Sequence, residues 1–215
     1  MTDGAPTGDP ARHQVWVLRH GATEWSVNGR HTGRTDLPLT DEGRAEATAL
    51  ASLLGGRRFA LVLVSPLERA RETCRLAGYA EVAVVDDDLL EWDYGRYEGV
   101  TSAEIRETVP GWTVFTGDCP DGETIAQVAA RADRVIARAL EADGDVALFA
   151  HGHILRVLTA RWCQLDAVEG RRFPLETATL NILGWEHEYP VIRRWNDQAR
   201  TSPNRVSDRR TWCAI

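Results

Sequence analysis

Residues 15–21, Val15-Trp16-Val17-Leu18-Arg19-His20-Gly21, decide the fold and supply the first candidate for chemistry. Four apolar residues run directly into an arginine and a histidine, a pattern typical of a buried strand that ends at a sheet edge. A second apolar run, Val146 to Phe149, ends in the same way with Ala150-His151-Gly152. Ligands of open α/β sheets bind beyond the carboxyl ends of the strands. We therefore expect both histidines in one cleft if these strands are neighbours.

Outward from these two strands, short apolar runs alternate with helical patterns. Further buried strands are predicted at Leu61 to Val64, Val82 to Val85 and Thr179 to Leu183. Thr40 predicts the N-cap of a helix that ends before Gly55-Gly56. One face of this helix carries Ala47, Leu50 and Leu54.

Three more helices are expected between the strands. Ser65-Pro66 predicts an N-cap followed by a first-turn proline. Longer patterns predict helices over Glu123 to Ala142 and over His153 to Trp162. The alternation predicts an α/β fold, a single-domain three-layer sandwich with a mostly parallel central sheet.

Composition narrows the classes of partner. The 215 residues, 43% of them hydrophobic, are enough for one core. A formal charge of -7 gives no general attraction to nucleic acid or to an anionic membrane, so we expect neither as a partner. An anionic substrate then requires a local basic pocket. All 25 basic residues are Arg, whose planar fork suits phosphate.

The ends of the chain and its cysteines bear on location. Residues 1–12 are predicted to be a disordered leader and residues 196–215 a loosely attached tail, flanking one domain at 13–195. No signal peptide or membrane span is apparent, and the cysteines lack ligand spacing, so we expect reduced thiols and a cytoplasmic protein. The cysteines are Cys74, Cys119, Cys163 and Cys213. No heptad or apolar patch decides between a monomer and a homodimer.

The two strand-end histidines are candidates for phosphate chemistry. Arg19 adjoins His20, and Arg69 lies in a helix that also follows a strand end, so cationic groups converge there. A neutral imidazole nitrogen can attack phosphorus to give a phosphohistidine. We predict His20 as the nucleophile and His151 as a donor to the oxygens that gain charge.

Glu91 is the candidate for the proton donor. It follows an apolar stretch and adjoins Trp92, and an apolar neighbour favours the protonated carboxyl that a departing alkoxide needs. The same carboxylate could then activate water against the phosphohistidine.

Each signal has a structural alternative. A single His-Gly after a strand is most often a turn, Arg69 could lie on a solvated helix face, and Glu91 could be a surface carboxylate. A metal-hydrolase interpretation of His151-Gly152-His153 is weaker, because no Asp/His set with ligand spacing accompanies it. His13 and His187 are interpreted as surface residues. Core or rim positions are expected for Tyr97, Trp112, Phe115 and Trp162.

In combination, these motifs resemble the histidine phosphatase superfamily, in its phosphoglycerate-mutase-like branch, over most of residues 14–185. The matching stretches are residues 18–25, 29–33, 39–43, 65–70, 91–99 and 150–153. The resemblance implies a phosphoglycerate-mutase-like fold and a small phosphate ester as substrate, with neither cofactor nor metal. It also implies the catalytic core: His20 as phosphohistidine nucleophile, Glu91 as proton donor, and a phosphate pocket completed by Arg19, Arg69 and His151.

The resemblance implies further substrate contacts around this core. The resemblance implies substrate contacts for Thr32, Gly33 and Tyr94, which occupy positions where relatives contact substrate. Ser26 and His153 stand where relatives tend to carry Asn, which leaves their contacts less defined. The remaining candidates are Gly152 within the second motif and, for a distal phosphate or hydroxyl, His31 and Arg156.

The surroundings of the pocket bear on the choice between phosphatase and mutase. Mutases of the family insert a segment with paired basic residues after the motif that contains Glu91. In this sequence residues 97–130 contain a single basic residue, Arg106. This favours a phosphatase, and several stretches look closest to actinobacterial acid phosphatases and the fungal sedoheptulose-bisphosphatase. A mutase stays as the alternative. So does a non-catalytic phospho-ligand binding protein, although such proteins usually lose the nucleophile or the acid.

Overall fold

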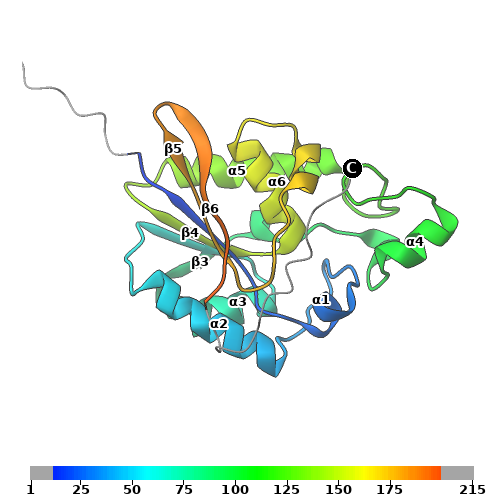
Figure 1. Cartoon of the computed structure of the whole chain (residues 1–215), viewed down its shortest axis with the longest axis horizontal. Coiled ribbons are helices and arrows are strands. Elements are labelled where there is room, and N and C mark those ends of the chain that lie inside the picture. The colour runs from blue at the N-terminus through cyan, green and yellow to red at the C-terminus, as the bar shows by residue number, and fades with distance from the viewer. Residues whose placement is uncertain (1–11, 200–215) are drawn as a thin grey trace, which may run out of the picture.

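The first apolar run of the sequence forms a central strand of the sheet. The computed structural model describes residues 12–199, which form a six-stranded sheet in the order β3-β2-β4-β1-β5-β6 (Figure 1). The strands are β1 (Val15–Arg19), β2 (Leu61–Val64), β3 (Ala83–Val85), β4 (Val146–Ala150), β5 (Leu180–Glu186) and β6 (Tyr189–Asp197). Strands β3, β2, β4 and β1 are parallel, β5 pairs antiparallel with β1, and β6 pairs antiparallel with β5.

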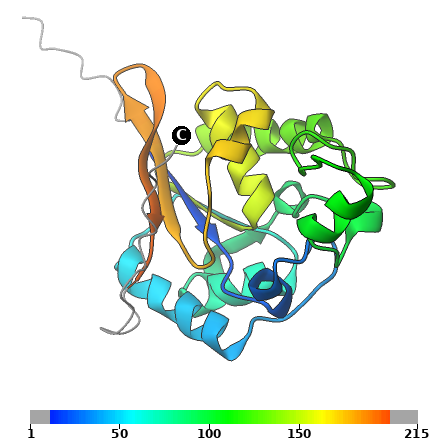
Figure 2. The same ribbon diagram turned by 45° about the vertical axis from the view of Figure 1, so that its right-hand side comes forward.

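Helices cover both faces of this sheet (Figure 2). The α-helices are α1 (Glu24–Asn28), α2 (Asp41–Leu54), α3 (Glu68–Leu76), α4 (Ser102–Thr108), α5 (Ile125–Leu140) and α6 (Gly152–Trp162). Short 3-10 segments are η1 (Ala80–Val82), η2 (Asp87–Leu89), η3 (Gly95–Tyr97) and η4 (Ala167–Arg172). Thr40 caps α2 through Gly43 N–H, as predicted.

The alternation of side chains along β1 explains the two helix layers. Val15 and Val17 pack into a core with residues of α5 and α6, whereas Trp16 and Leu18 pack with residues of α2 and α3. All four are buried, and each such side chain contributes roughly 1.5–3 kcal/mol. The predicted three-layer α/β sandwich is therefore confirmed.

Two local predictions were wrong. Helix α3 begins at Glu68, and its N-cap position is Leu67, so Ser65-Pro66 does not cap it. The run at Val82 to Val85 is not buried on both faces, because β3 is the edge strand and Val84 and Val85 are 45% and 52% exposed.

The sheet also extends past the predicted end of the domain. Strand β6 was not predicted, because its apolar residues are interrupted by Arg193 and Arg194. Asn196 and Asp197 belong to this strand and not to a tail. Residues 1–11 and 200–215, with Cys213, lie outside the described part. No helix within residues 12–199 is long and apolar enough to cross a membrane.

Candidate active site

The parallel pairing of β1 with β4 brings the two strand-end histidines together. Arg19 is in register with Ala150, and His20 N–H donates to the Ala150 carbonyl at 3.0 Å. The imidazole centroids of His20 and His151 are 5.1 Å apart, and both side chains are buried. The two strands are therefore neighbours, as the expectation required, and the two rings lie side by side at their ends.

The His20 ring has a defined tautomer. Its Nδ1 lies 2.7 Å from the Gly21 carbonyl oxygen, which can only accept, so Nδ1 carries the proton and Nε2 keeps its lone pair. Burial, together with the charges of Arg69 and Arg19, holds the pKa of His20 well below its usual value. The ring is therefore neutral near pH 7 and presents a nucleophilic Nε2.

His151 is fixed in the opposite tautomer. Arg69 Nε–H donates to His151 Nδ1 at 3.1 Å, so the His151 proton resides on Nε2, which donates to Ser65 Oγ at 2.7 Å. Burial and the Arg69 charge lower the His151 pKa well below the usual value. The Ser65 hydroxyl therefore accepts a hydrogen bond from this histidine and does not cap a helix.

Arg69 is fully buried behind His151 and clamps the loop that carries Thr32 and Gly33. Its guanidinium donates to the carbonyls of Thr32, Gly33 and Thr35 at 3.1, 2.8 and 2.9 Å. With the bond to His151, four of its five N–H groups are used within the described chain. On the other side of the loop, Glu98 accepts from Gly33 N–H at 2.8 Å. Arg69 thus holds the pocket wall.

Arg19 contributes a hydrogen-bond donor that has no acceptor among the described residues. Its guanidinium donates to the Leu175 carbonyl, but its buried Nε–H has no hydrogen-bond partner among the described residues. A Cβ at position 152 would lie 3.4 Å from the Arg19 guanidinium carbon and 3.6 Å from a Glu91 carboxyl oxygen. The absence of a side chain at Gly152 thus keeps the space between these two groups open. An unpaired buried donor of this kind suits an anionic oxygen.

Glu91 is buried and held by backbone N–H groups. Its Oε1 accepts from Trp92 and Ile154 N–H and its Oε2 from His153 N–H, each at 2.9 Å. The last two donors belong to the first turn of α6, where helix N–H groups are free for an acidic partner. The indole of Trp92 instead donates to the Glu123 carbonyl. The predicted apolar setting of Glu91 is therefore corrected to one of fixed backbone donors.

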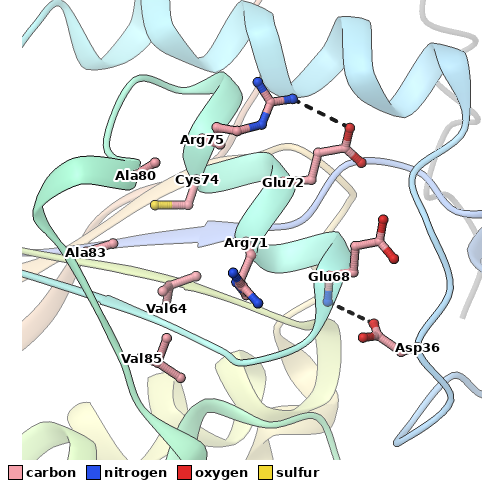
Figure 3. A pocket seen from close by; sticks show the side chains of 10 residues that line it. All are labelled: Asp36, Val64, Glu68, Arg71, Glu72, Cys74, Arg75, Ala80, Ala83 and Val85. Atoms are coloured by element: carbon pink, nitrogen blue, oxygen red, sulfur yellow. Dashed lines mark hydrogen bonds and ion pairs between the residues drawn. The ribbon is translucent and has the colours of Figure 1, made fainter.

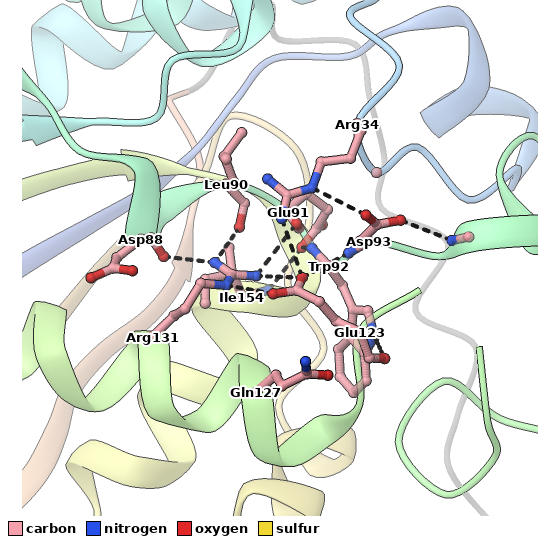
Figure 4. Close-up of polar contacts among 12 residues, drawn as sticks. Arg34, Asp88, Leu90, Glu91, Trp92, Asp93, Glu123, Gln127, Arg131 and Ile154 are labelled. Atoms are coloured by element: carbon pink, nitrogen blue, oxygen red, sulfur yellow. Dashed lines mark hydrogen bonds and ion pairs between the residues drawn. The ribbon is translucent and has the colours of Figure 1, made fainter. Parts of the chain in front are cut away.

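An ion pair missed by sequence reasoning fixes the segment before Glu91 (Figure 4). Arg131 of α5 is nearly buried and grips both carboxyl oxygens of Glu123 at 2.8 and 2.9 Å. Its NH1 donates to the carbonyls of Asp88 and Leu90 at 2.7 and 2.8 Å. The only sequence signal is an arginine on the buried face of an otherwise amphipathic helix.

The glycines of the two His-Gly motifs differ in role. The Gly21 N–H donates to Thr73 Oγ1 at 3.1 Å and is therefore not free for a bound anion. A Cβ at Gly21 would lie 2.2 Å from the Gly43 carbonyl oxygen, so this glycine permits close packing of two backbones. Gly152, by contrast, lines the site.

Two adjoining hollows make up the site. The inner chamber, about 90 Å³, is lined by Arg19, His20, Ser26, Arg30, His31, Thr32, Glu91, Tyr94, Gly152, His153, Arg156 and Leu175. The outer chamber, about 530 Å³, is lined by Arg19, Ser26, Gly29, Arg30, His31, Ser102, Arg106, Thr113, Val114, Phe115, Thr116, His153, Arg156 and Arg171. Most predicted site residues thus come together, whereas Gly33, Arg69 and His151 are not among these lining residues. Arg30, Arg106 and Arg171 were not predicted.

An aromatic cluster lies beside the two chambers, and two of its rings, His31 and His153, line both of them. Tyr94 Oη and His153 Nδ1 are 2.6 Å apart, and the His31 ring lies 4.7 Å from Tyr94 and 5.3 Å from Trp112. Burial, with a smaller contribution from Arg106, lowers the His31 pKa to about 4. Burial, then Arg156 and His31, lowers the His153 pKa well below its usual value. Both rings are therefore neutral near pH 7.

A third hollow, about 490 Å³, lies beside α3 and the β3 edge (Figure 3). It shares no lining residue with the other two. Its carboxylates Asp36, Glu68 and Glu72 face Arg71 and Arg75, and Glu72 pairs with Arg75. This mixture of charges has little net attraction for a phosphate dianion. Within residues 12–199 no three His, Cys, Asp or Glu side chains are grouped as metal ligands.

The fold and the strand-end histidines are those of an enzyme that acts on phosphate esters. The chain belongs to the histidine phosphatase superfamily (branch 1), whose family model matches residues 15–198. An acid phosphatase of Mycobacterium tuberculosis is 47% identical over 179 residues, which cover 81% of this chain and 88% of the relative. A solved structure of an open reading frame product from the same species has a TM-score of 0.83 at 43% identity, covering 87% and 98% of the two chains.

Two further relatives carry more specific names. A sedoheptulose 1,7-bisphosphatase of Saccharomyces cerevisiae is 36% identical over 68% of this chain and 66% of its own length. A 2,3-bisphosphoglycerate-dependent phosphoglycerate mutase of Gloeobacter violaceus is 38% identical over 74% and 80%. Most of the named homologues are phosphatases, which supports a phosphoric monoester hydrolase and gives the mutase alternative less support.

Proposed function

We propose that this enzyme hydrolyses small phosphate monoesters, without a metal ion, through a phosphohistidine on His20. The observation that carries this proposal is the His20 tautomer. Because Nδ1–H donates to the Gly21 carbonyl, Nε2 is an unprotonated nucleophile in a buried chamber that also holds the unpaired Arg19 Nε–H.

In the first step, His20 Nε2 attacks phosphorus, the P–N bond forms and the ester P–O bond breaks. Glu91 transfers its proton to the departing alkoxide, and its three backbone N–H contacts hold the carboxyl in place for this transfer. Nδ1 keeps its proton and its bond to Gly21 O throughout. Arg19, whose Nε–H is unpaired among the described residues, is the donor that stabilises charge on the phosphoryl oxygens, and His151 joins it when its Nε2–H exchanges Ser65 Oγ for a phosphoryl oxygen.

In the second step, water attacks the phosphohistidine. The Glu91 carboxylate accepts a proton from that water as the P–O bond forms and the P–N bond breaks. His20 returns to its neutral tautomer, Glu91 is again protonated, and inorganic phosphate leaves. Both steps use the same carboxylate, which explains why Glu91 is fixed so tightly next to the chamber.

Sugar phosphates are the substrate class we propose within these monoesters. The yeast relative is named for a sugar bisphosphate, and the outer chamber, about 530 Å³, has the size of a small-molecule site. Among the residues proposed to contact substrate, those that line both chambers are Ser26, His31, His153 and Arg156, and those that line the inner chamber alone are Thr32 and Tyr94. A cytoplasmic location and homodimer formation stay predictions from the sequence.

A mutase is the second candidate, favoured by the Gloeobacter violaceus relative and by the basic outer chamber. A mutase would return the phosphoryl group to an acceptor bound in that chamber before water reacts. Incubation with 3-phosphoglycerate separates the two functions, because a phosphatase releases inorganic phosphate whereas a mutase forms the 2-isomer faster.

The test of the proposed function is turnover of p-nitrophenyl phosphate combined with trapping of the phosphoenzyme. We expect an acid-labile, base-stable phosphohistidine after quenching, and His20→Ala should lose both this species and at least roughly 10⁴-fold in kcat. His187→Ala, at an exposed position in the β5–β6 turn, serves as the matched control and should keep full activity. Undiminished turnover in His20→Ala would remove His20 from the nucleophile role.

A further inference from the structure

The outer chamber is lined by five arginines and no carboxylate. The arginines are Arg19, Arg30, Arg106, Arg156 and Arg171. The chain as a whole carries a formal charge of -7, so this concentration of positive charge is local. A cleft with walls of one sign and low polarizability raises the local concentration of ligands of the opposite sign.

Among these arginines, Arg106 has a guanidinium group that forms a single hydrogen bond to the other described residues. It is held in α4 by a bond from its Nε to the Trp112 carbonyl at 2.8 Å, which leaves its two terminal nitrogens without a partner in the described chain. Its charge lowers the pKa of His31, which lines both chambers. The exposed Arg106 side chain therefore lines the outer chamber, and its charge acts on a histidine that lines both chambers.

Arg156 is oriented from the opposite element, α6. Its guanidinium stacks on Phe115 at 4.7 Å and donates to the carbonyls of Gly170 and Arg171 at 3.1 and 3.0 Å. Like Arg106, it forms no ion pair with a carboxylate in the described part of the chain. Both guanidinium groups are thus positioned by neutral carbonyls, and no carboxylate of the described chain lies within ion-pair distance of either.

Two further arginines of the outer chamber, Arg30 and Arg171, are paired with carboxylates. Arg30 lies 3.6 Å from Glu104 and Arg171 lies 3.1 Å from Glu169, and both arginine side chains are at least 40% exposed. Exposed pairs of this kind contribute little and exchange readily. The difference identifies Arg106 and Arg156 as the main determinants of what the chamber binds.

From this arrangement we infer that the outer chamber binds a second oxyanion of the substrate, with Arg106 and Arg156 as its main ligands. The inference rests on the proposed function and deepens it. The inner chamber, about 90 Å³, holds little more than the phosphoryl group, so the remainder of the ester must occupy the outer chamber. A distal phosphate or carboxylate there meets paired guanidinium forks, whereas a neutral or cationic remainder leaves their charges unmatched. The enzyme is therefore selective for small esters with two anionic ends.

Matched substrates test this selectivity without any mutation. Fructose 1,6-bisphosphate is compared with fructose 6-phosphate, and 3-phosphoglycerate with glycerol 3-phosphate, by release of inorganic phosphate. We expect kcat/KM to be about 10- to 100-fold higher for at least one member with the second oxyanion, the value of one or two charge-assisted hydrogen bonds. A higher kcat/KM within the fructose pair would indicate that the chamber prefers a phosphate, and a higher value within the glycerol pair would indicate that it prefers a carboxylate. Equal values within both pairs would overturn the inference.

Variants then assign the effect to the proposed ligands. Arg106→Gln should lower kcat/KM for the preferred two-anion substrate roughly 10-fold more than for p-nitrophenyl phosphate, mainly through KM. Arg96→Gln, an exposed arginine paired with Asp121 outside both chambers, is the matched control and should leave all values unchanged. An equal loss on all substrates in Arg106→Gln would overturn the assignment.

The two proposals fail in distinguishable ways. If wild-type protein does not turn over p-nitrophenyl phosphate or any sugar phosphate, the proposed hydrolase function is wrong. If it turns these over but shows no preference within the substrate pairs, the hydrolase function stands and the second oxyanion site is wrong.

Discussion

The inner and outer chambers differ in how their polar groups are satisfied. At the inner chamber the imidazoles of His20 and of His151 behind it have defined tautomers, set by the Gly21 carbonyl and by Arg69. In the outer chamber the guanidinium groups of Arg106 and Arg156 keep free N–H groups and form no ion pair within the described chain. The inner chamber is thus organised for one reaction geometry and the outer chamber for recognition of charge.

The difference has an energetic reason. Buried donors and acceptors strengthen interactions at the reacting centre only if they are oriented in advance, because reorientation during the reaction is costly. Recognition tolerates more freedom, since a planar guanidinium can bind an oxyanion in several ways. Changes in the inner chamber should therefore alter kcat, and changes in the outer chamber should alter KM and selectivity.

The largest effect in this comparison, beyond loss of His20 itself, is expected for Glu91→Gln. The amide cannot donate a proton to the leaving oxygen, so kcat on an alkyl phosphate should fall by about 10²–10⁴. The loss on p-nitrophenyl phosphate should be smaller, because nitrophenolate leaves without a proton. Initial rates on both esters provide the measurement.

A matched control for this substitution is Glu188→Gln, an exposed carboxylate in the β5–β6 turn. It should retain wild-type rates on both esters. Equal losses on the two esters in Glu91→Gln would contradict the role of Glu91 as proton donor and would indicate a purely structural one.

An intermediate effect is expected for Arg131→Gln, which removes the pair with Glu123 and the bonds to the Asp88 and Leu90 carbonyls. Breaking a buried ion pair should lower the free energy of unfolding by about 3 kcal/mol. As a positioning residue for Glu91, Arg131 should also affect kcat on the alkyl ester by roughly 10-fold, with KM little changed. Urea titration and steady-state kinetics measure the two effects.

Arg134→Gln is the control on the same helix. Arg134 pairs with the Asp88 carboxylate, but it is 59% exposed, so its loss should cost no more than about 1 kcal/mol and leave kcat unchanged. If Arg131→Gln slowed alkyl and aryl esters equally, its role would be structural and independent of the proton donor.

Much of the fold follows from patterns within single segments. The strands at Val15 and Val146 were predictable because each is a continuous apolar run, and the α2 N-cap at Thr40 because its contact is local. Strand β6 was not predictable, since Arg193 and Arg194 interrupt its apolar residues and the strand is defined by its pairing with β5. Ser65 was misassigned as a helix cap because its partner, His151, lies 86 residues away.

The site shows the same limit. The candidate core of His20, Glu91 and His151 could be located because strand ends and motifs mark these positions. The wall of the outer chamber could not, because Arg106 and Arg171 reach it from α4 and η4 through packing that no sequence pattern records. In the sequence Arg106 is the only basic residue of residues 97–130, and this scarcity of basic residues argued against a mutase. In the structure Arg106 lines the outer chamber together with four other arginines.

The smallest effect links the two chambers through His31. Burial and Arg106 lower the His31 pKa from 6.5 to about 4, so the unfolded chain binds more protons than the folded one between these pH values. The free energy of unfolding therefore falls as the pH decreases from 6.5 toward 4, by up to about 3 kcal/mol, because protonation of His31 favours the unfolded chain. Arg106→Gln removes the lesser of the two causes, so the His31 pKa should rise by less than about one unit. Imidazole NMR titration, with Arg96→Gln as control, measures this rise. An unchanged His31 pKa in Arg106→Gln would show that the Arg106 charge does not reach the passage between the chambers, and the selectivity expected of the outer chamber would then have to arise from Arg156.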